Sequence, residues 1–348
     1  MAIQFVMREK ILAINSRYIL AYYHGKIVLK DKETKKTIKQ LRIHKGIAAT
    51  PFVERIMRFE PRVACEISEN SFMYTDHGAI YEYDCLKNNI KVSHKFRHGM
   101  NNPLTLCVRK EEGKVKNVLY GDYIWNEKKG SVSIYCYDLK KWKRIYTFPS
   151  NSIKHVHNII YNDNTNKYII LTGDDDIESG FWEADEEFRN VKLIIGENQK
   201  YRSCVCWPQE NGKVVYATDT PLEDNSLFLL DDTKKIHEIY NMPGPCIFGM
   251  KFNNKLYLST SVEGDPTEGK WRYRFSYKLG RGVQDRYVHI IVCDNEFRVR
   301  ELAKFKKDIL PMWLCQFGNA QFVCSDDEIF FTLQGTKKKG TYKLYDDI

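Results

Sequence analysis

One repeated unit constrains the fold of this chain more than any other feature. The unit is an apolar strand-like run, a polar turn and a second run that ends near an aspartate. Seven copies occur, at residues 18–31, 71–84, 118–138, 168–185, 214–232, 256–294 and 328–347. The aspartates are Asp31, Asp84, Asp138, Asp185, Asp231, Asp294 and Asp346, with successive gaps of 53, 54, 47, 46, 63 and 52 residues. Such a period indicates one structural unit built several times.

The period favours an all-β protein, a β-propeller of about seven four-stranded blades, with six possible. Blades typically take about 40–50 residues and four strands each. The last copy ends after its third strand, while residues 2–7 form a spare apolar strand. We expect this strand to complete the last blade and close the ring, because closure removes an open sheet edge. We also expect one domain over residues 1–348, with an insertion at about 265–286 in the longest gap.

Composition narrows the class of protein. The N-terminus lacks the apolar run of a signal peptide, and no stretch of 18 apolar residues is present. The ten cysteines have no CxxC spacing and fit buried thiols of a reducing compartment, so we expect a cytoplasmic protein without a membrane span. The net charge of +9 lies largely in turn lysines, which favours solubility over a nucleic-acid partner. An acidic glycan would suit the same charge.

Unusual polar residues concentrate in two kinds of loop. In an antiparallel blade, the turn between the second and third strands opens on the same face as the connection from the previous blade. The predicted turns contain Asp122, Asp174, Glu178, Asp219 and Glu263. The predicted connections contain His155, His157, Asn158, Lys200, Tyr201 and Arg202. Because binding residues tend to lie on loops over a rigid scaffold, we place the functional site on this face.

His155 and His157 alternate at the start of a strand, so both side chains should point the same way, toward the channel. Together they suit a divalent metal, and either suits a general base. They also suit plain hydrogen bonds to neighbouring blades. A metal near His155, His157 and Asp174 is therefore one of three open interpretations.

The candidate carboxylates and the segment 200–202, which contains a lysine and an arginine, also have more than one interpretation. Asp174 directly follows its strand, and Asp122 and Asp219 occupy the equivalent place in flanking blades. They suit acid, base or nucleophile roles, although aspartate is also a common turn residue. Arg202 can hold a carboxylate by two parallel hydrogen bonds, and Tyr201 can exchange a proton, or the segment can form an interblade ion pair.

Residues 121–265 resemble the sialidase-like (BNR-type) propeller proteins associated with bacterial exopolysaccharide and capsule gene clusters. The similar segments are GDYIWN, HVHN, TGDDDIESG, QKYRS and ATDTP, in the order and spacing typical of that group. The resemblance implies a carbohydrate-active protein with its site among these segments. Asp122 stands where the group usually has Glu, and Asn158 where it usually has Gly. The sialidase arginine triad and tyrosine nucleophile are absent, so sialidase activity itself is not expected.

These observations predict a protein that acts on a bacterial, acidic polysaccharide. As a lyase, Arg202 or Lys200 would neutralise a uronate carboxylate while His157 or Tyr201 takes the C5 proton. As a glycoside hydrolase, two of Asp122, Asp174 and Asp219 would be the acid and the base or nucleophile. The lyase is slightly preferred. Asn158, Glu178 and Glu263 are expected to contact the substrate together with Arg202 and Lys200. The alternative is a non-catalytic glycan-binding or assembly protein that uses the same face.

Overall fold

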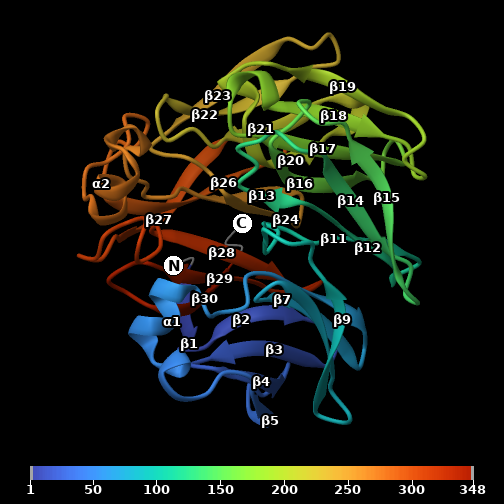
Figure 1. The fold of residues 1–348 in the computed structure, drawn as a ribbon, viewed down its shortest axis with the longest axis vertical. Helices are drawn as coiled ribbons and strands as arrows, with labels where there is room; N and C mark the ends of the chain where they lie inside the picture. Colours follow the sequence, from blue (N-terminus) through green and yellow to red (C-terminus); the bar gives the residue numbers. More distant parts are fainter. Residues whose placement is uncertain (1–2, 346–348) are drawn as a thin grey trace. The chain divides into compact units, whose positions relative to one another are not determined.

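The computed structural model describes residues 3–345, which are mostly β-strands (Figure 1). Within these residues the strands form seven four-stranded sheets and one two-stranded ribbon. The fold is thus an all-β, seven-bladed β-propeller, which confirms the predicted fold class and gives seven blades, not six.

The chain divides into two compact units, each described separately below. The N-terminal unit comprises Leu12–Ile43 and Phe59–Ser203. The C-terminal unit comprises the chain up to Ile11, His44–Arg58, and the chain from Cys204 onward.

Four blades belong to the N-terminal unit. Their strands, in sheet order, are β2 (Lys10–Ile14), β3 (Tyr18–Tyr23), β4 (Lys26–Asp31) and β5 (Thr37–Arg42); β6 (Ala64–Ser68), β7 (Ser71–Asp76), β8 (Ala79–Asp84) and β9 (Asn89–Lys95); β11 (Cys107–Glu111), β12 (Lys114–Gly121), β14 (Val132–Tyr137) and β15 (Trp142–Phe148); and β16 (His155–Asn162), β17 (Lys167–Gly173), β18 (Gly180–Ala184) and β19 (Val191–Gly196). The ribbon pairs β10 (Met100–Asn101) with β13 (Tyr123–Ile124).

Three blades belong to the C-terminal unit. Their strands are β20 (Ser203–Pro208), β21 (Val214–Thr218), β22 (Asn225–Leu230) and β23 (Ile236–Met242); β24 (Phe248–Phe252), β25 (Lys255–Ser259), β26 (Tyr287–Cys293) and β27 (Val299–Lys306); and β28 (Asn319–Cys324), β29 (Ile329–Gln334), β30 (Gly340–Leu344) and β1 (Ile3–Met7). The N-terminal strand β1 pairs antiparallel with β30, which confirms that it completes the last blade. Ala2 and Asp346 lie outside the described residues.

Short helices interrupt the strand pattern. They are α1 (Pro51–Met57), α2 (Lys270–Phe275) and the 3-10 turns η1 (Gly46–Ala49), η2 (Asp176–Glu178), η3 (Gln199–Tyr201), η4 (Glu210–Gly212) and η5 (Pro266–Glu268). The repeat did not predict α1 or α2. The segment 265–286 holds η5 and α2, between β25 and β26. Among the described residues, no helix has the length and apolar character needed to cross a membrane.

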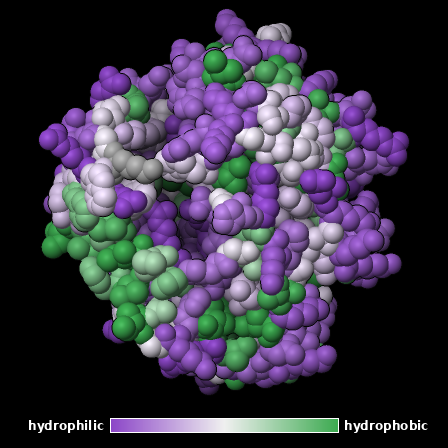
Figure 2. Space-filling view, viewed as in Figure 1, coloured by the Kyte–Doolittle hydropathy of each residue, from purple (hydrophilic) through white to green (hydrophobic). Residues whose placement is uncertain are grey.

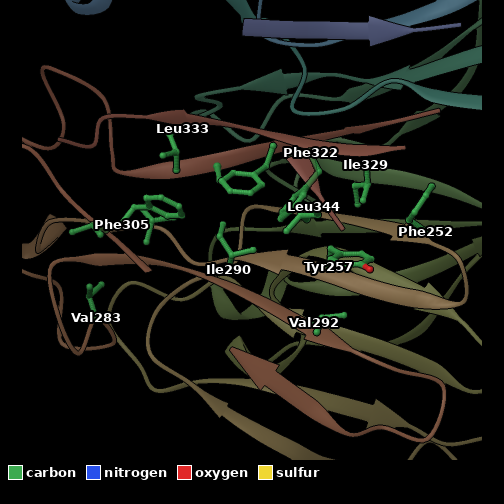
Figure 3. Close-up of a cluster of buried hydrophobic side chains, with 14 of the residues drawn as sticks. Phe252, Tyr257, Val283, Ile290, Val292, Phe305, Phe322, Ile329, Leu333 and Leu344 are labelled. Atoms are coloured by element: carbon green, nitrogen blue, oxygen red, sulfur yellow. The ribbon is translucent and has the colours of Figure 1, made fainter. Parts of the chain in front are cut away.

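Burial follows strand position within a blade. The second strands β3 and β17 are apolar and almost wholly buried, whereas the fourth strands β5 and β9 alternate and are largely exposed. A strand covered on both faces needs a continuous apolar run, while an outer strand needs only alternate apolar residues. In the C-terminal unit, side chains such as Phe305, Ile290 and Phe322 form one contiguous core (Figure 3).

The repeated aspartate has a structural role in the turn between the third and fourth strands. In six blades its carboxylate accepts backbone N–H groups from the following residues. The aspartates are Asp31, Asp84, Asp138, Asp185, Asp231 and Asp294. Such side-chain bonds replace backbone partners that a tight turn leaves unpaired. The residue that revealed the period is therefore the residue that forms the turn.

Asp231 and its neighbour Asp232 provide a test of this role. Asp231 accepts hydrogen bonds from the backbone of Thr233 and Lys235 and from the His237 ring. These bonds lower the pKa of Asp231, so the stabilisation is present above the ordinary carboxyl pKa of about 3.9 and is lost below it. We expect Asp231→Ala to lower the melting temperature at neutral pH by a few degrees, measured by circular dichroism, and Asp232→Ala to leave it nearly unchanged. Equal effects of the two substitutions would contradict the turn role.

Candidate active site

Three side chains of the N-terminal unit converge at the start of β16 and the end of β17. The Nε2 atoms of His155 and His157 lie 3.1 Å apart. The Asp174 Oδ1 atom lies 3.4 Å from Nε2 of His155 and 3.2 Å from Nε2 of His157. Both histidines are buried, and Asp174 is partly exposed. We call these three residues the His–His–Asp cluster.

Local backbone features bring the two rings together. The register of β16 against β17 shifts between Val156 and Asn158, so His157 occupies a bulge. A bulge re-aims a side chain relative to a regular strand. The His157 ring also lies against Gly173, where a Cβ atom would come within 2.5 Å of the ring. Glycine at position 173 therefore leaves the space that the ring occupies.

Backbone carbonyls select the tautomer of each imidazole. His155 Nδ1 lies 2.8 Å from the Ile124 carbonyl oxygen, and His157 Nδ1 lies 3.0 Å from the Ser203 carbonyl oxygen. A carbonyl can only accept, so each Nδ1 must carry a proton and donate it. In the neutral rings both Nε2 atoms then keep their lone pairs. Hydrogen bonds of this kind commonly orient histidines that bind metals.

This arrangement of acceptors favours the binding of a cation. Two Nε2 lone pairs and a carboxylate oxygen face one another at 3.1–3.4 Å. Such a set of acceptors is stable when an added proton or a metal ion lies among them. Two histidines and one carboxylate form a donor set that binds divalent transition metals. The ligand atoms lie close enough together to hold one ion.

Asp174 is held by two further cations. Lys154 Nζ lies 3.2 Å from its Oδ2 atom, and Arg202 Nη2 lies 3.2 Å from its Oδ1 atom. Arg202 and Gln199 also donate to the Asp174 backbone carbonyl. Burial opposes ionisation of Asp174. When an added proton lies on the histidines, the charges of His155 and Arg202 and the histidine hydrogen bonds hold the pKa of Asp174 well below the usual range. The carboxylate stays ionised, and two cationic side chains remain beside it to attract an anion.

Aromatic side chains that were not among the predicted site residues border the cluster. The Tyr123 ring lies 4.5 Å from the His155 ring. Trp125 is 59% exposed, and Lys154 Nζ lies 5.8 Å above its ring. Lys154 was also missed, although it directly precedes the HVH motif. An exposed tryptophan beside a polar cluster offers a flat apolar surface of the kind that stacks against sugar rings.

Asp122 lies outside the cluster. Its side chain is fully buried, forms an ion pair of 2.8 Å with Arg97 and accepts the Ser133 N–H. Burial raises the pKa of Asp122, against the lowering effect of Ser133 and Arg97. Asp122 and Asp174 therefore occupy equivalent places in their blades, as expected, but they have different partners.

The remaining candidates of the N-terminal unit have varied surroundings. Glu178 is buried and forms an ion pair of 2.8 Å with Lys129. Asn158 accepts a hydrogen bond from Thr105. Lys200 is exposed on η3, and Tyr201 is half-buried on the same turn, next to Arg202. Tyr201 directly precedes Arg202, which contacts the cluster, and its hydroxyl group can exchange a proton.

Two candidates belong to the C-terminal unit. Asp219 is buried and accepts a hydrogen bond from the Cys204 thiol at 3.3 Å. Glu263 is buried and accepts the Ser261 hydroxyl. Within their own unit these carboxylates take part in local polar contacts.

Comparisons with known proteins concern the fold. No family profile matches this chain, and no curated protein is similar in sequence. An oligogalacturonate lyase from Vibrio parahaemolyticus is similar in structure, with a TM-score of 0.59 and 14% identity over 99% of this chain and 90% of that chain. An oligogalacturonate lyase in complex with manganese has a TM-score of 0.59 and 12% identity, over 97% of this chain and 89% of that chain. The β-propeller domain of Cps50 (Swd1) from Myceliophteria thermophila has a TM-score of 0.56 and 9% identity, over 99% of this chain and 100% of that chain.

At these identities the likeness establishes the β-propeller fold alone. The resemblance to BNR-type proteins of exopolysaccharide clusters stays a prediction, as does the single-domain organisation.

Metal titration tests the cluster directly. We expect Mn²⁺ or Zn²⁺ to bind with one-to-one stoichiometry in isothermal titration calorimetry. Asp174→Asn and His157→Gln should weaken binding by more than the roughly 10- to 100-fold that loss of an outer partner costs. Gly173→Ala should also weaken binding, because the added methyl group displaces the His157 ring. Glu178→Gln, a buried carboxylate outside the cluster, is the control. Unchanged affinity in Asp174→Asn would exclude the cluster as the site.

The two aspartates should affect stability with opposite dependence on pH. The lowered pKa of Asp174 stabilises the fold above the ordinary carboxyl pKa of about 3.9, and this contribution is lost as the pH falls below that value. Because the pKa of Asp122 is raised, its carboxyl stays protonated to a higher pH in the folded state than in the unfolded state. The contribution of Asp122 to the stability of the fold therefore declines as the pH rises above about 3.9.

We therefore expect the stability difference between wild type and Asp174→Asn to shrink on acidification. The difference between wild type and Asp122→Asn should instead move in favour of wild type. Urea unfolding at a series of pH values measures both differences. The same trend in both variants would contradict the assigned shifts.

Proposed function

We propose that the His–His–Asp cluster is the centre of a lyase site for uronate-containing oligosaccharides. The observation that supports this most is the convergence of two imidazole acceptors and an ionised carboxylate, with Lys154 and Arg202 beside them. Cations gathered in this way suit an anionic substrate. The fold likeness to oligogalacturonate lyases, one of them in complex with manganese, supports the same reaction class.

The residues present fit a divalent metal ion. Nε2 of His155, Nε2 of His157 and Oδ1 of Asp174 would hold it, and both imidazoles are already oriented by backbone carbonyls. Such an ion supplies Lewis-acid stabilisation of negative charge on a substrate carboxylate.

Lys154 and Arg202 would bind and orient the substrate carboxylate. Both cations now share the single carboxylate of Asp174, which leaves an excess of positive charge at this point. Arg202 presents a planar fork that matches a carboxylate, whereas Lys154 acts as a point charge. Neutralising the carboxylate makes the adjacent C5–H bond of a uronate more acidic, which is what elimination requires.

The elimination itself needs a base and a leaving group. The base removes the C5 proton, the electron pair forms the C4=C5 double bond, and the C4–O bond breaks, with the leaving oxygen taking up a proton. Tyr201 is the proposed base when a metal occupies the cluster, since both histidines are then ligands. Without a metal, His157 takes this role, because its Nε2 carries a lone pair.

Trp125 would form a sugar-binding surface next to the reacting ring. Its ring is exposed, and the neighbouring Ile124 carbonyl holds His155, so the tryptophan is fixed close to the cluster. Aromatic rings give a sugar a large contact area at small entropic cost.

A glycoside hydrolase is the second candidate, favoured by one observation. The buried carboxyl of Asp122 has a raised pKa, which is the property of a general acid. Its ion pair with Arg97 and its place outside the cluster weigh against this role.

The cytoplasmic location also remains a prediction, supported by ten unpaired cysteines.

The test is incubation of the pure protein with polyuronates and neutral polysaccharides, with and without Mn²⁺. We expect a new ultraviolet absorbance from an unsaturated uronate, only with acidic substrates. Arg202→Met and Asp174→Asn should reduce kcat/KM by at least about 100-fold, as loss of a transition-state contact typically does. Trp125→Ala should mainly raise KM, because it removes binding that the ground state also uses.

The controls separate the alternatives. Leu86→Ser changes an exposed apolar residue of the same unit and should leave the rate unchanged. Shorter products without absorbance, lost in Asp122→Asn, would replace the lyase with a hydrolase. Tight binding of oligouronate without any product would replace both with a glycan-binding protein.

A further inference from the structure

Exposed apolar side chains gather on one part of the C-terminal unit. Of seventeen large hydrophobic residues that are exposed in the described part of the chain, seven lie in three short segments around α1, around α2 and before β28. We call these seven the α1–α2 patch: Ile47, Phe52, Met57, Trp271, Phe275, Tyr277 and Ile309. Trp271 and Ile309 are 74% and 78% exposed. Figure 2 shows hydrophobic atoms gathered at the lower left, near the place where Figure 1 labels α1.

Specific contacts join the three segments into one surface. Arg55 of α1 forms an ion pair with Asp308 and donates to the Cys315 carbonyl. The Trp313 ring lies 5.8 Å from the Arg58 guanidinium and 5.0 Å from that of Arg274 in α2. Trp313 therefore links α1 to α2, and the patch is a built surface of packed segments.

The exposed charged side chains around the patch are basic. In residues 44–58, 265–286 and 307–315, the charged side chains classed as exposed are Lys45, Arg58, Arg272, Lys278 and Arg281, all basic, among those whose side chains are described. The acidic residues of these segments are buried, half-buried or paired. Glu54 is buried, Asp308 pairs with Arg55 and Lys307, and Asp265 pairs with Lys278. Glu268 is half-buried, and Asp285 pairs with His289.

Aliphatic, aromatic and basic residues together match one kind of partner. We propose that the α1–α2 patch docks this protein onto an anionic lipid bilayer. Isoleucine, methionine and phenylalanine side chains would enter the acyl boundary, and Trp271 and Tyr277 would lie at the headgroup level. Lys45, Arg58, Arg272 and Arg281 would meet anionic headgroups. A second copy of the chain fits less well, because a two-fold contact would bring this basic surface against itself.

Docking on lipid is independent of the glycan site. The patch belongs to the C-terminal unit, and the His–His–Asp cluster belongs to the N-terminal unit. Binding to vesicles therefore tests this proposal whatever the catalytic assays find.

The experiment is flotation of the full-length protein with unilamellar vesicles. We expect binding to vesicles of phosphatidylcholine with phosphatidylglycerol, little binding to phosphatidylcholine alone, and weaker binding as ionic strength rises. The double variant Trp271→Ser with Ile309→Ser should lose about tenfold or more in affinity, since both side chains are largely exposed and apolar. Arg272→Gln with Arg281→Gln should weaken binding to the anionic vesicles.

A matched control and a second readout complete the test. Leu86→Ser with Leu139→Ser removes two exposed apolar side chains of the other unit and should bind like wild type. Brominated lipids should quench tryptophan fluorescence in wild type and less in Trp271→Phe, which keeps an apolar ring. Absence of binding to anionic vesicles would overturn the proposal, as would equal loss in the control. Self-association that disappears in the Trp271→Ser and Ile309→Ser variant would assign the patch to a second copy.

Discussion

A hydrogen bond from backbone N–H groups to an aspartate carboxylate recurs in the turn between the third and fourth strands of six blades. Each turn reverses the chain so that the fourth strand pairs antiparallel with the third. Asp138 is an example. Its carboxylate accepts hydrogen bonds from the N–H groups of Lys140 and Lys141, and β15 then begins at Trp142. Without this turn, the third strand would keep an unpaired edge, which is a site for aggregation. The same bond therefore supports the blade and makes the repeat visible in the sequence.

The seventh blade depends on the two ends of the chain. Strand β1 supplies the fourth strand of the sheet formed by β28, β29 and β30. Thr341 of β30 also donates to the Glu9 carbonyl, just beyond β1. A contact between residues so distant in sequence has a large entropic cost of loop closure, which is offset only when the whole sheet forms. The last blade is thus completed by long-range pairing.

The candidate site combines short-range sequence signals with long-range contacts. His155, His157, Asp174 and Arg202 were all singled out from the sequence. The histidines alternate at the start of a strand, Asp174 directly follows its strand, and Arg202 lies at a connection between blades. Lys154 and Trp125 were missed, since a lone lysine or tryptophan in a loop has no distinctive spacing. Asp122 was grouped with Asp174 from its position in the blade. Its partner Arg97 lies in a distant segment and makes the carboxyl part of a buried ion pair.

The sequence by itself determined the blade period, the strand order within each blade and the loops in which polar residues collect. These follow from local physics: apolar runs form inner strands, and aspartates form turns. Only the tertiary structure decided which polar groups meet. The bulge at His157, the space above Gly173 and the carbonyls of Ile124 and Ser203 set the direction and the tautomer of two imidazoles. The exposed α1–α2 patch was likewise decided in three dimensions, because it joins segments that are separated by more than two hundred residues along the chain.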